Sequence, residues 1–326
     1  MFVVFLCLAH CSDFLLEGAS PVSRSSISGY ENVHVSYCLF QNLNDVNNGG
    51  ALMISGITYT CLVENCRFLR CFSSASNTAY QNNGGGGIYS SVSKCILENL
   101  CFFECTTLSH GQGIHSGASS VFNTYQVSIV GSDSRAYNSY CPFWFYYSNV
   151  SSIYSNCSSN IVSLYSSGIH AYASTTSVEV YFSNIANCSS GGGIILEAVM
   201  GGKFFYHHMN IVNNKYGSHY GVLRTASCGS ISLNNLLFYH NIGSTVLSSK
   251  EATTINFIQC SFDISLASIG GYDSHSLCSF NVVYSNEPLF SYQVHNCEAN
   301  NKQTQGSFFI KKSMLELFSS VLLLYF

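Results

Sequence analysis

Apolar and polar residues alternate along most of the chain in short runs that are separated by Asn, Gly and Cys. The runs at 32–40, 178–182, 230–237 and 255–262 alternate with a period of two and are rich in Val, Ile, Tyr, Phe and Thr. This composition and period are typical of strands of about five residues. The spacing of an amphipathic helix is nearly absent. The pattern therefore predicts an all-β protein built from many short strands.

Two sequence signals meet in the stretch 38–52 and recur downstream. In the first, an apolar residue is followed three positions later by Asn, as in Leu39 and Asn42. Copies of it, some with Cys or Ser in place of Asn, begin about every 27 residues. They are Leu39/Asn42, Phe68/Cys71, Phe102/Cys105, Ile129/Ser132, Ile153/Asn156, Ile185/Cys188, Ile211/Asn214, Phe238/Asn241, Phe262/Ser265 and Val283/Asn286.

The second signal is a glycine pair that runs directly into apolar residues. It is seen first in Gly49, Gly50, Ala51 and Leu52. It returns at 85–88, 111–114, 168–169, 191–195 and 221–223. We expect the glycine pairs Gly49/Gly50, Gly85/Gly86 and Gly192/Gly193 to turn the chain with positive φ and to permit close approach of neighbouring coils.

A repeat of this length without helices narrows the architecture. Leucine-rich, ankyrin and tetratricopeptide repeats need helices or a fixed leucine ladder, and propeller blades need about 40 residues or more. A parallel β-helix, a solenoid of about ten coils, is the prediction. We expect Asn42, Asn156, Asn214, Asn241 and Asn286 to form its corners, because Asn tolerates the left-handed backbone and can donate and accept amide hydrogen bonds from coil to coil.

The chain is predicted to divide into four parts. Residues 1–12 contain an apolar run at 2–9 of the length of a secretory signal peptide, with a buried first strand as the alternative. Residues 13–34 are expected to form an N-terminal cap and 35–300 the repeat domain. Residues 301–326 end in an apolar run too short for a bilayer. This apolar run predicts a C-terminal cap, and the alternatives are a lipid-anchor signal or a truncated membrane span.

Composition and sequons favour secretion. Only 9% of residues are charged, 47% are hydrophobic and the formal net charge is −4. Without a basic stripe, nucleic acid is a poor partner. Sequons at Asn149, Asn156 and Asn187 are predicted glycosylation sites. For the 16 cysteines we expect both disulfides and stacked core thiols, with stacking the commoner.

The repeats resemble those of a known group of proteins. The literal Phe-x-x-Asn at Phe238–Asn241, the Gly-Gly-Ala-Leu at 49–52 and the degenerate copies are similar to the paired repeats of chlamydial polymorphic outer-membrane proteins and of parabasalid protist surface proteins. The resemblance covers about residues 35–300. It implies a right-handed β-helix that acts in adhesion or antigenic display, with a host or cell-surface protein or a glycan as partner. Cys71, Cys105 and Cys188 depart from strict copies.

An enzyme and a structural fragment are the alternatives. The pectin-lyase-like fold hosts lyases and glycosidases, which need paired carboxylates or an acidic calcium site with a basic group. The candidate carboxylates are Asp45, Asp263 and Asp273, with Arg67, Arg70, Arg135, Lys203 and Arg224 as candidate basic partners. We expect each of these aspartates to lie on a solvated loop, although Asp263 and Asp273 share a coil. A purely structural fragment of a larger surface protein is the other alternative.

We expect no metal and no cofactor. His207, His208, His219 and His240 occupy different positions of the repeat, and the cysteine trios 61/66/71 and 95/101/105 lack a zinc-type Cys pair.

The densest aromatic cluster interrupts the repeat at 141–147. Phe143, Trp144, Phe145 and Tyr146 predict either an exposed platform for a glycan or protein, or core filling.

Overall fold

A computed structural model of the 326-residue chain describes residues 13–281, except 57–59, 76–83, 118–120, 135–140, 164–165, 173–176, 192–193, 200, 218–220, 228, 244–245, 250–253 and 270–273. The predicted signal peptide at 1–12, the C-terminal segment 301–326 and the corner residues Gly192, Gly193 and Asn286 lie outside the described residues.

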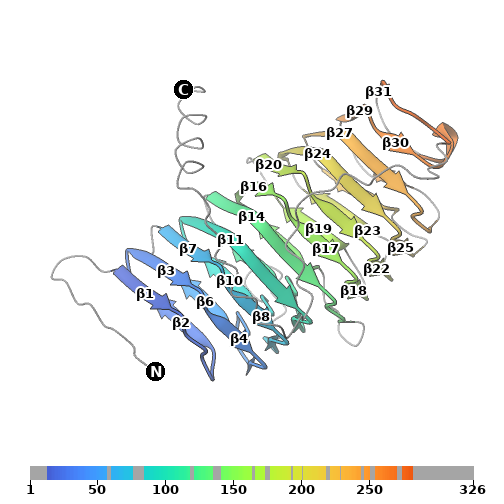
Figure 1. Ribbon diagram of the computed structural model, residues 1–326. Helices are drawn as coiled ribbons and strands as arrows, with labels where there is room; N and C mark the ends of the chain where they lie inside the picture. The colour runs from blue at the N-terminus through green and yellow to red at the C-terminus, as the bar shows by residue number, and fades with distance from the viewer. Residues whose placement is uncertain are drawn as a thin grey trace, which may run out of the picture.

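The chain winds into a parallel β-solenoid (Figure 1), as the repeat predicted. Every strand pair among the described residues is parallel and joins one turn to the next. The one helical segment described is a short 3-10 turn, η1 (Leu266–Ser268). In the described part of the chain no helix is long and apolar enough to cross a membrane.

Two long ladders form the main faces. The broad sheet follows the order β1 (Asp13–Glu17), β3 (Asn32–Ser36), β7 (Thr60–Glu64), β11 (Lys94–Phe103), β14 (Val121–Val130), β16 (Asn149–Ile153), β20 (Ser177–Tyr181), β24 (Lys203–Val212), β27 (Ser230–Tyr239), β29 (Thr254–Ile258) and β31 (Ser274–Ser276). It also includes β4 (Leu39–Gln41), β8 (Arg67–Leu69), β17 (Asn156–Ser158), β21 (Asn184–Ala186) and β30 (Ser261–Phe262).

The narrow sheet faces the broad one across the core. Its order is β2 (Ser25–Ser28), β6 (Leu52–Ser55), β10 (Ile88–Ser91), β13 (Ile114–Gly117), β15 (Phe143–Tyr146), β19 (Ser166–Tyr172), β23 (Ile194–Val199), β26 (Leu223–Ala226) and β28 (Leu247–Ser249). A third side consists of two short sheets. They contain β5 (Asn44–Asp45), β9 (Phe72–Ser73) and β12 (Thr106–Thr107), then β18 (Ile161–Val162), β22 (Ser189–Ser190) and β25 (Lys215–Tyr216).

The solenoid has about seven turns rather than the predicted ten. The third side runs only from β5 to β25, so the turns that have all three sides lie between these strands. Beyond these complete turns the strands of the two long ladders form incomplete turns at both ends of the solenoid. The repeat signals of the sequence include these incomplete turns, which explains the higher predicted number. Residues 13–34, predicted as a cap, belong to this extension: β1 pairs with β3 and β2 pairs with β6.

One row of residues fills the core under the broad sheet. Its members, in register from turn to turn, are Phe40, Phe68, Phe102, Ile129, Cys157, Ile185, Ile211, Phe238 and Phe262. The ring centroids of Phe40 and Phe68 lie 4.7 Å apart, and those of Phe68 and Phe102 lie 4.6 Å apart. The phenylalanines therefore stack along the axis of the solenoid.

In two copies of the repeat, the core residue differs from the predicted one. Phe40, not Leu39, is the core residue of its turn, and Cys157, not Ile153, is the core residue of another. Asn156 consequently lies within β17, away from the corner. Leu39 and Ile153 are apolar but half-exposed. A prediction from hydrophobicity alone therefore chose a residue one position before Phe40 and one four positions before Cys157.

Left-handed residues bend the broad sheet twice per turn. At the first bend they are Tyr37, Asn65, Asn99, Gln126, Tyr154, Phe182, His208, Asn235, Gln259 and Leu277. At the second they are Asn42, Arg70, Glu104, Gly131, Ser159, Asn187, Asn213 and His240. Of the four predicted Asn corners that the structure describes, only Asn42 is itself left-handed. Asn214 and Asn241 come one residue after the bend, where the side chain re-enters the core.

The buried corner asparagines hold successive turns together through their amides. Asn214 Nδ2 donates to the Ile185 carbonyl at 3.0 Å, and Asn214 Oδ1 accepts from the Cys188 amide at 2.9 Å. Asn160 makes the equivalent bonds to the Ile129 carbonyl and the Ser132 amide. The side-chain amides expected to form a ladder thus bond mainly to backbone groups. These bonds provide partners for buried N–H and C=O groups at the corner.

The glycine pairs have the two roles expected of them. Gly49 and Gly85 have φ of +69° and +75°. A Cβ on Gly50 would lie 2.4 Å from the Gly86 carbonyl oxygen of the next turn. After the glycines, Ala51 and Leu52 enter the core with no exposed surface.

The cysteines are mostly core residues. Among the described residues eleven are free thiols, ten of them buried, and Cys101 is disulfide-bonded. Stacked thiols are therefore the commoner state in this part of the chain, as expected.

Candidate functional site

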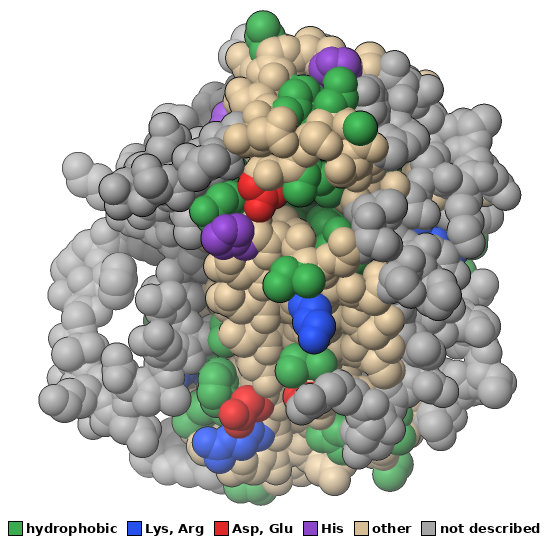
Figure 2. Space-filling view, turned by 90° about the vertical axis from the view of Figure 1, so that its right-hand side faces the viewer, with side chains coloured by type: hydrophobic (Ala, Val, Ile, Leu, Met, Phe, Trp, Pro, Cys, Tyr) green, Lys and Arg blue, Asp and Glu red, His purple; other side chains and the backbone are tan. Residues whose placement is uncertain are grey.

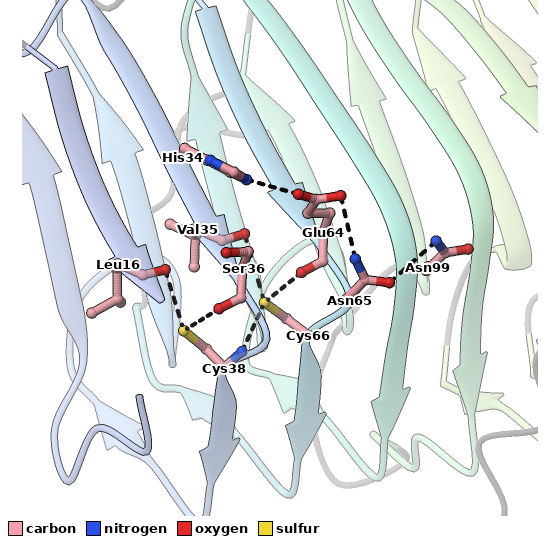
Figure 3. A network of polar contacts seen from close by, with 9 residues as sticks. All are labelled: Leu16, His34, Val35, Ser36, Cys38, Glu64, Asn65, Cys66 and Asn99. Carbon is pink, nitrogen blue, oxygen red and sulfur yellow. Dashed lines mark hydrogen bonds and ion pairs between the residues drawn. The ribbon is translucent and has the colours of Figure 1, made fainter. Parts of the chain in front are cut away.

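Two carboxylates lie next to each other on the outer face of the broad sheet. Glu64 ends β7 and is the Cα partner of Glu98 in β11. His34, on the neighbouring strand β3, places Nε2 2.8 Å from Glu64 Oε1 (Figure 3). Strand alternation puts all three side chains on the solvent side, because the intervening Val35 and Val63 point into the core.

Amides extend this polar group along the first bend. Asn65 Nδ2 donates to Glu64 Oε2 at 3.3 Å, and Asn99 Nδ2 donates to Asn65 Oδ1 at 3.3 Å (Figure 3). Asn65 and Asn99 are both left-handed bend residues, with φ of 52°. The backbone bend therefore aligns the amides beside the carboxylates.

The two carboxylates have different surroundings. Burial, and secondarily the charge of Glu64, raises the pKa of Glu98. Glu64 has the His34 imidazole as an ion-pair partner. A carboxyl with a raised pKa beside a paired carboxylate can in principle provide a proton donor and an acceptor.

A thiol pair lies under this polar group. The Cys38 amide donates to Cys66 Sγ at 3.3 Å (Figure 3). Cys38 Sγ donates to the Ser36 carbonyl, and Cys66 Sγ donates to the Glu64 carbonyl. The hydrogen bond with the Cys66 thiol lowers the pKa of Cys38 to about 7 and raises that of Cys66. One thiol of the pair therefore ionises before the other.

The aspartates chosen from the sequence do not converge. Asp45 forms an ion pair with Arg24, with 3.4 Å between Oδ2 and Nε. Asp263 Oδ2 accepts from the His240 amide at 2.6 Å. Asp273 lies outside the described residues. Asp45 thus belongs to a strand, β5, rather than to a loop, and Asp263 lies in the bend that follows β30.

The sequence contained a signal for the glutamates that was missed. Glu64-Asn65 and Glu98-Asn99 each stand four residues before a core phenylalanine, at Phe68 and Phe102. The same dipeptide in the same repeat position predicts stacked side chains. The candidate carboxylates chosen from the sequence were aspartates only, so this repeated dipeptide was not among them.

No protein-family model matches the chain, and neither the curated proteins nor the solved structures contain a significant match. The site is therefore interpreted from its own geometry.

The aromatic cluster of β15 is buried rather than exposed. Phe143, Phe145, Trp144 and Tyr146 are at most 5% exposed. Trp144 stacks on His170 with ring centroids 3.9 Å apart and an interplanar angle of 7°. The prediction of a platform on these four side chains is corrected to core and inter-turn packing.

A second group of aromatic side chains does lie on the outer face. We call Tyr125, Tyr154, Tyr181, Phe182, His207 and His208 the aromatic strip. All six are half-exposed and lie on β14, β20 and β24 or at the first bend. Phe182 stacks between Tyr154 and His208, at centroid distances of 5.4 and 4.9 Å. Tyr181 stacks on His207 at 4.9 Å.

The aromatic strip continues the row of the carboxylates. Tyr125 is the Cα partner of Glu98, and beyond it Tyr181 is the partner of His207. Tyr181 Oη donates to Glu179 Oε2 at 2.9 Å, and burial together with this bond raises the pKa of Tyr181 to about 12. Burial lowers the pKa of His207, which favours its neutral form. One outer face thus changes from acidic to aromatic along the axis.

Charge is sparse elsewhere. In Figure 2 the charged side chains on the visible face are few and scattered among backbone and uncharged side chains. Within the described ranges, no group of three or more His, Cys, Asp or Glu could hold a metal ion.

The sequons differ in accessibility. Asn149 and Asn187 are exposed, whereas Asn156 is half-buried in β17. Asn149 Oδ1 accepts from the Ser177 amide, and Asn187 is a left-handed bend residue. Asn149 and Asn187 are therefore more accessible than Asn156.

Proposed function

We propose that this protein is a secreted or cell-surface β-solenoid that acts without catalysis, by binding a protein partner in adhesion or antigenic display. The observation that carries the proposal is the aromatic strip. Tyrosine and other aromatic side chains are enriched in protein interfaces, where charged residues are depleted from the centre. A row of such side chains over several consecutive turns supplies a long, regular contact surface.

The stacking within the strip favours a protein over a glycan. Sugars pack against the open faces of aromatic rings, but both faces of Phe182 are covered, by Tyr154 on one side and His208 on the other. The rings present mainly their edges to solvent. Edges and the Tyr hydroxyls suit the side chains and backbone of a protein partner.

Location and family stay proposals as well. The apolar run at 2–9 and the exposed sequons at Asn149 and Asn187 support secretion. The solenoid is compatible with β-helix repeat proteins. From the repeat motifs we infer that the solenoid is right-handed. We also infer that its repeats are similar to those of chlamydial polymorphic outer-membrane proteins and parabasalid surface proteins.

The proposal is tested by binding of the full chain to arrays of extracellular proteins and of glycans. The test variant is Tyr154→Asn with Phe182→Asn, because Asn tolerates the left-handed backbone of both positions. The control is Tyr37→Asn, which changes the same bend position, 62% exposed, outside the strip. We expect a protein ligand whose binding falls at least about tenfold in the double variant alone. Absence of any protein ligand, or equal binding by both variants, would refute the proposal.

A second candidate function rests on Glu98 and Glu64. Their adjacency on one ladder, with a raised pKa for Glu98, is the arrangement that a glycosidase or lyase of the pectin-lyase-like class would need. It is tested by incubating the full chain with neutral and uronic polysaccharides and measuring new reducing ends and unsaturated products. Activity that Glu98→Gln abolishes would establish this function, whereas activity that survives in Glu98→Gln, or none on either class, would remove it.

A further inference from the structure

Eight cysteines form four pairs in which the two thiols occupy the same position on consecutive turns. The pairs are Cys38/Cys66, Cys61/Cys95, Cys71/Cys105 and Cys260/Cys278. Cys61 and Cys95 are direct Cα partners. The other pairs follow from the partners that flank them in the ladders. All eight are free thiols in the structure.

This geometry fits the requirements of a disulfide. In-register residues on neighbouring parallel strands lie about 4.8 Å apart. Disulfides join Cα atoms that are about 4.4–6.8 Å apart. In-register cysteines on consecutive turns therefore meet the Cα spacing that a disulfide needs.

Cys157 and Cys188 provide an internal contrast. They also lie on consecutive turns, but Cys157 is the Cα partner of Ile185, so the two belong to different rows. Cys157 Sγ donates to the Gly168 carbonyl, and Cys188 Sγ donates to the Cys157 carbonyl. Proximity alone therefore does not produce a stacked pair of thiols.

We propose that the four stacked pairs are inter-turn disulfide sites, which close in an oxidising compartment and join consecutive turns covalently near both ends of the solenoid. The middle turns have the amide bridges of Asn160, Asn214 and Asn241 at the second corner, whereas the paired thiols lie at Cys38–Cys105 and Cys260–Cys278. The end turns of a solenoid have a neighbour on one side only and open most easily. Covalent links have the largest effect there.

The oxidant is a low-molecular-weight disulfide such as glutathione disulfide. One cysteine thiolate attacks a sulfur of this disulfide, which forms a mixed disulfide and releases one glutathione thiolate. The second cysteine then attacks the protein-bound sulfur, closes the inter-turn bond and releases the second glutathione. Both thiol protons end on the two glutathione molecules, so each pair loses two protons and two electrons.

The pairs differ in access to the oxidant. Cys278 is half-exposed and lies over the buried Cys260, so this pair can close in the folded chain. An accessible thiol beside a resolving cysteine is the usual arrangement of a redox-active pair. The other six thiols are at most 2% exposed. We expect them to close during folding, before the turns are packed.

The test uses the full chain and needs no binding partner, so it is independent of adhesion, although an oxidising location in the cell rests on the proposed secretion. The reduced, folded chain is incubated with glutathione disulfide, and a second sample is refolded in its presence. Both are then alkylated, digested without reductant and mapped by mass spectrometry. We expect the folded chain to link Cys260 to Cys278, and the refolded chain to link all four pairs. Cys157 and Cys188 stay alkylated in both.

Two variants separate geometry from unspecific oxidation. Cys278→Ser is expected to leave Cys260 alkylated and to abolish the urea resistance that oxidation adds to the folded chain. Cys188→Ser is expected to leave all four links unchanged. Links among these eight thiols between different rows, a Cys157–Cys188 link, or eight alkylated thiols after oxidative refolding would overturn the proposal.

Discussion

The side-chain amides of Asn214 and Asn241, 27 residues apart, are in contact, with 3.0 Å between Nδ2 of the first and Oδ1 of the second. Each of these residues also donates to a backbone carbonyl of the preceding turn, at Ile185 and Ile211. A buried amide is therefore a connector between turns. The spacing of the repeat is what brings the next connector into position.

Replacing this connector should destabilise the solenoid. In Asn214→Ala the buried Cys188 amide and Ile185 carbonyl lose their partners, which costs about 1–3 kcal/mol per group. We expect a lower urea midpoint by circular dichroism. The control is Asn213→Gly, at the exposed left-handed position beside it, which should keep or raise the midpoint. Equal midpoints for Asn214→Ala and the native chain would contradict the prediction.

A methyl group at Gly50 should be far more harmful than one at Gly29. The added Cβ at Gly50 meets backbone of two neighbouring segments, with the Gly86 oxygen 2.4 Å and the Phe72 carbonyl carbon 2.5 Å away. Such overpacking costs about 3 kcal/mol or more. Gly29 has φ +79° but nothing within 4 Å of the added atom. Gly29→Ala should therefore show only the left-handed strain of about 1 kcal/mol. Thermal unfolding of both variants measures the difference, and similar losses would exclude close approach as the cause.

Truncation of the core stack should produce the largest effect of a single side chain. Phe68 has no exposed surface, and its ring stacks on Phe40 and on Phe102. We expect Phe68→Ala to lose about 3–5 kcal/mol of unfolding free energy in urea. Phe103→Ala, on the half-exposed outer side of β11, is the control and should lose much less. A small loss for Phe68→Ala would mean that the stack relaxes around the cavity.

The carboxylates should make stability depend on pH. Burial and Glu64 raise the pKa of Glu98 in the folded chain, so the folded state binds more protons than the unfolded state between the two pKa values. Stability therefore falls as pH rises through this window, and the penalty is complete above the folded pKa. We expect Glu98→Gln to raise the melting temperature near neutral pH and to change it little below about pH 3. Glu17→Gln, an exposed carboxyl on β1, is the control. A difference that is the same at both pH values would contradict the prediction.

Local sequence signals for strands and turns predicted much of the fold because each repeat contains the same signals. Alternation gave the strands, and the glycine pair at 49–50 gave a turn followed by a core strand, since only glycine fits the close approach there. The Asn signal was less exact: at Asn214 and Asn241 the predicted corner is one residue from the left-handed bend, occupied by Asn213 and His240. The left-handed positions of this bend hold residues as different as Asn42, Arg70 and His240, so composition does not locate the bend to one residue.

The candidate site was harder to predict than the fold. Glu64 and Glu98 are 34 residues apart in the sequence and become neighbours only through register. For Trp144 and its aromatic neighbours the sequence left open an exposed platform or core filling, and they are buried. The half-exposed aromatic strip is distributed over several turns with two or fewer members adjacent in sequence. Exposure depends on which face of a strand a residue occupies and on what covers that face.

The sequence by itself determined that the chain forms a parallel β-solenoid, because the period, the alternation and the glycines are each local properties of the chain. The tertiary structure decided the register between turns. Side chains that are far apart in sequence meet only when register is set, and a shift of one residue exchanges core and solvent. The pairing of Cys38 with Cys66, of Glu64 with Glu98 and of Phe182 with its stacked neighbours follows from that register, and with it every feature proposed here to have a function.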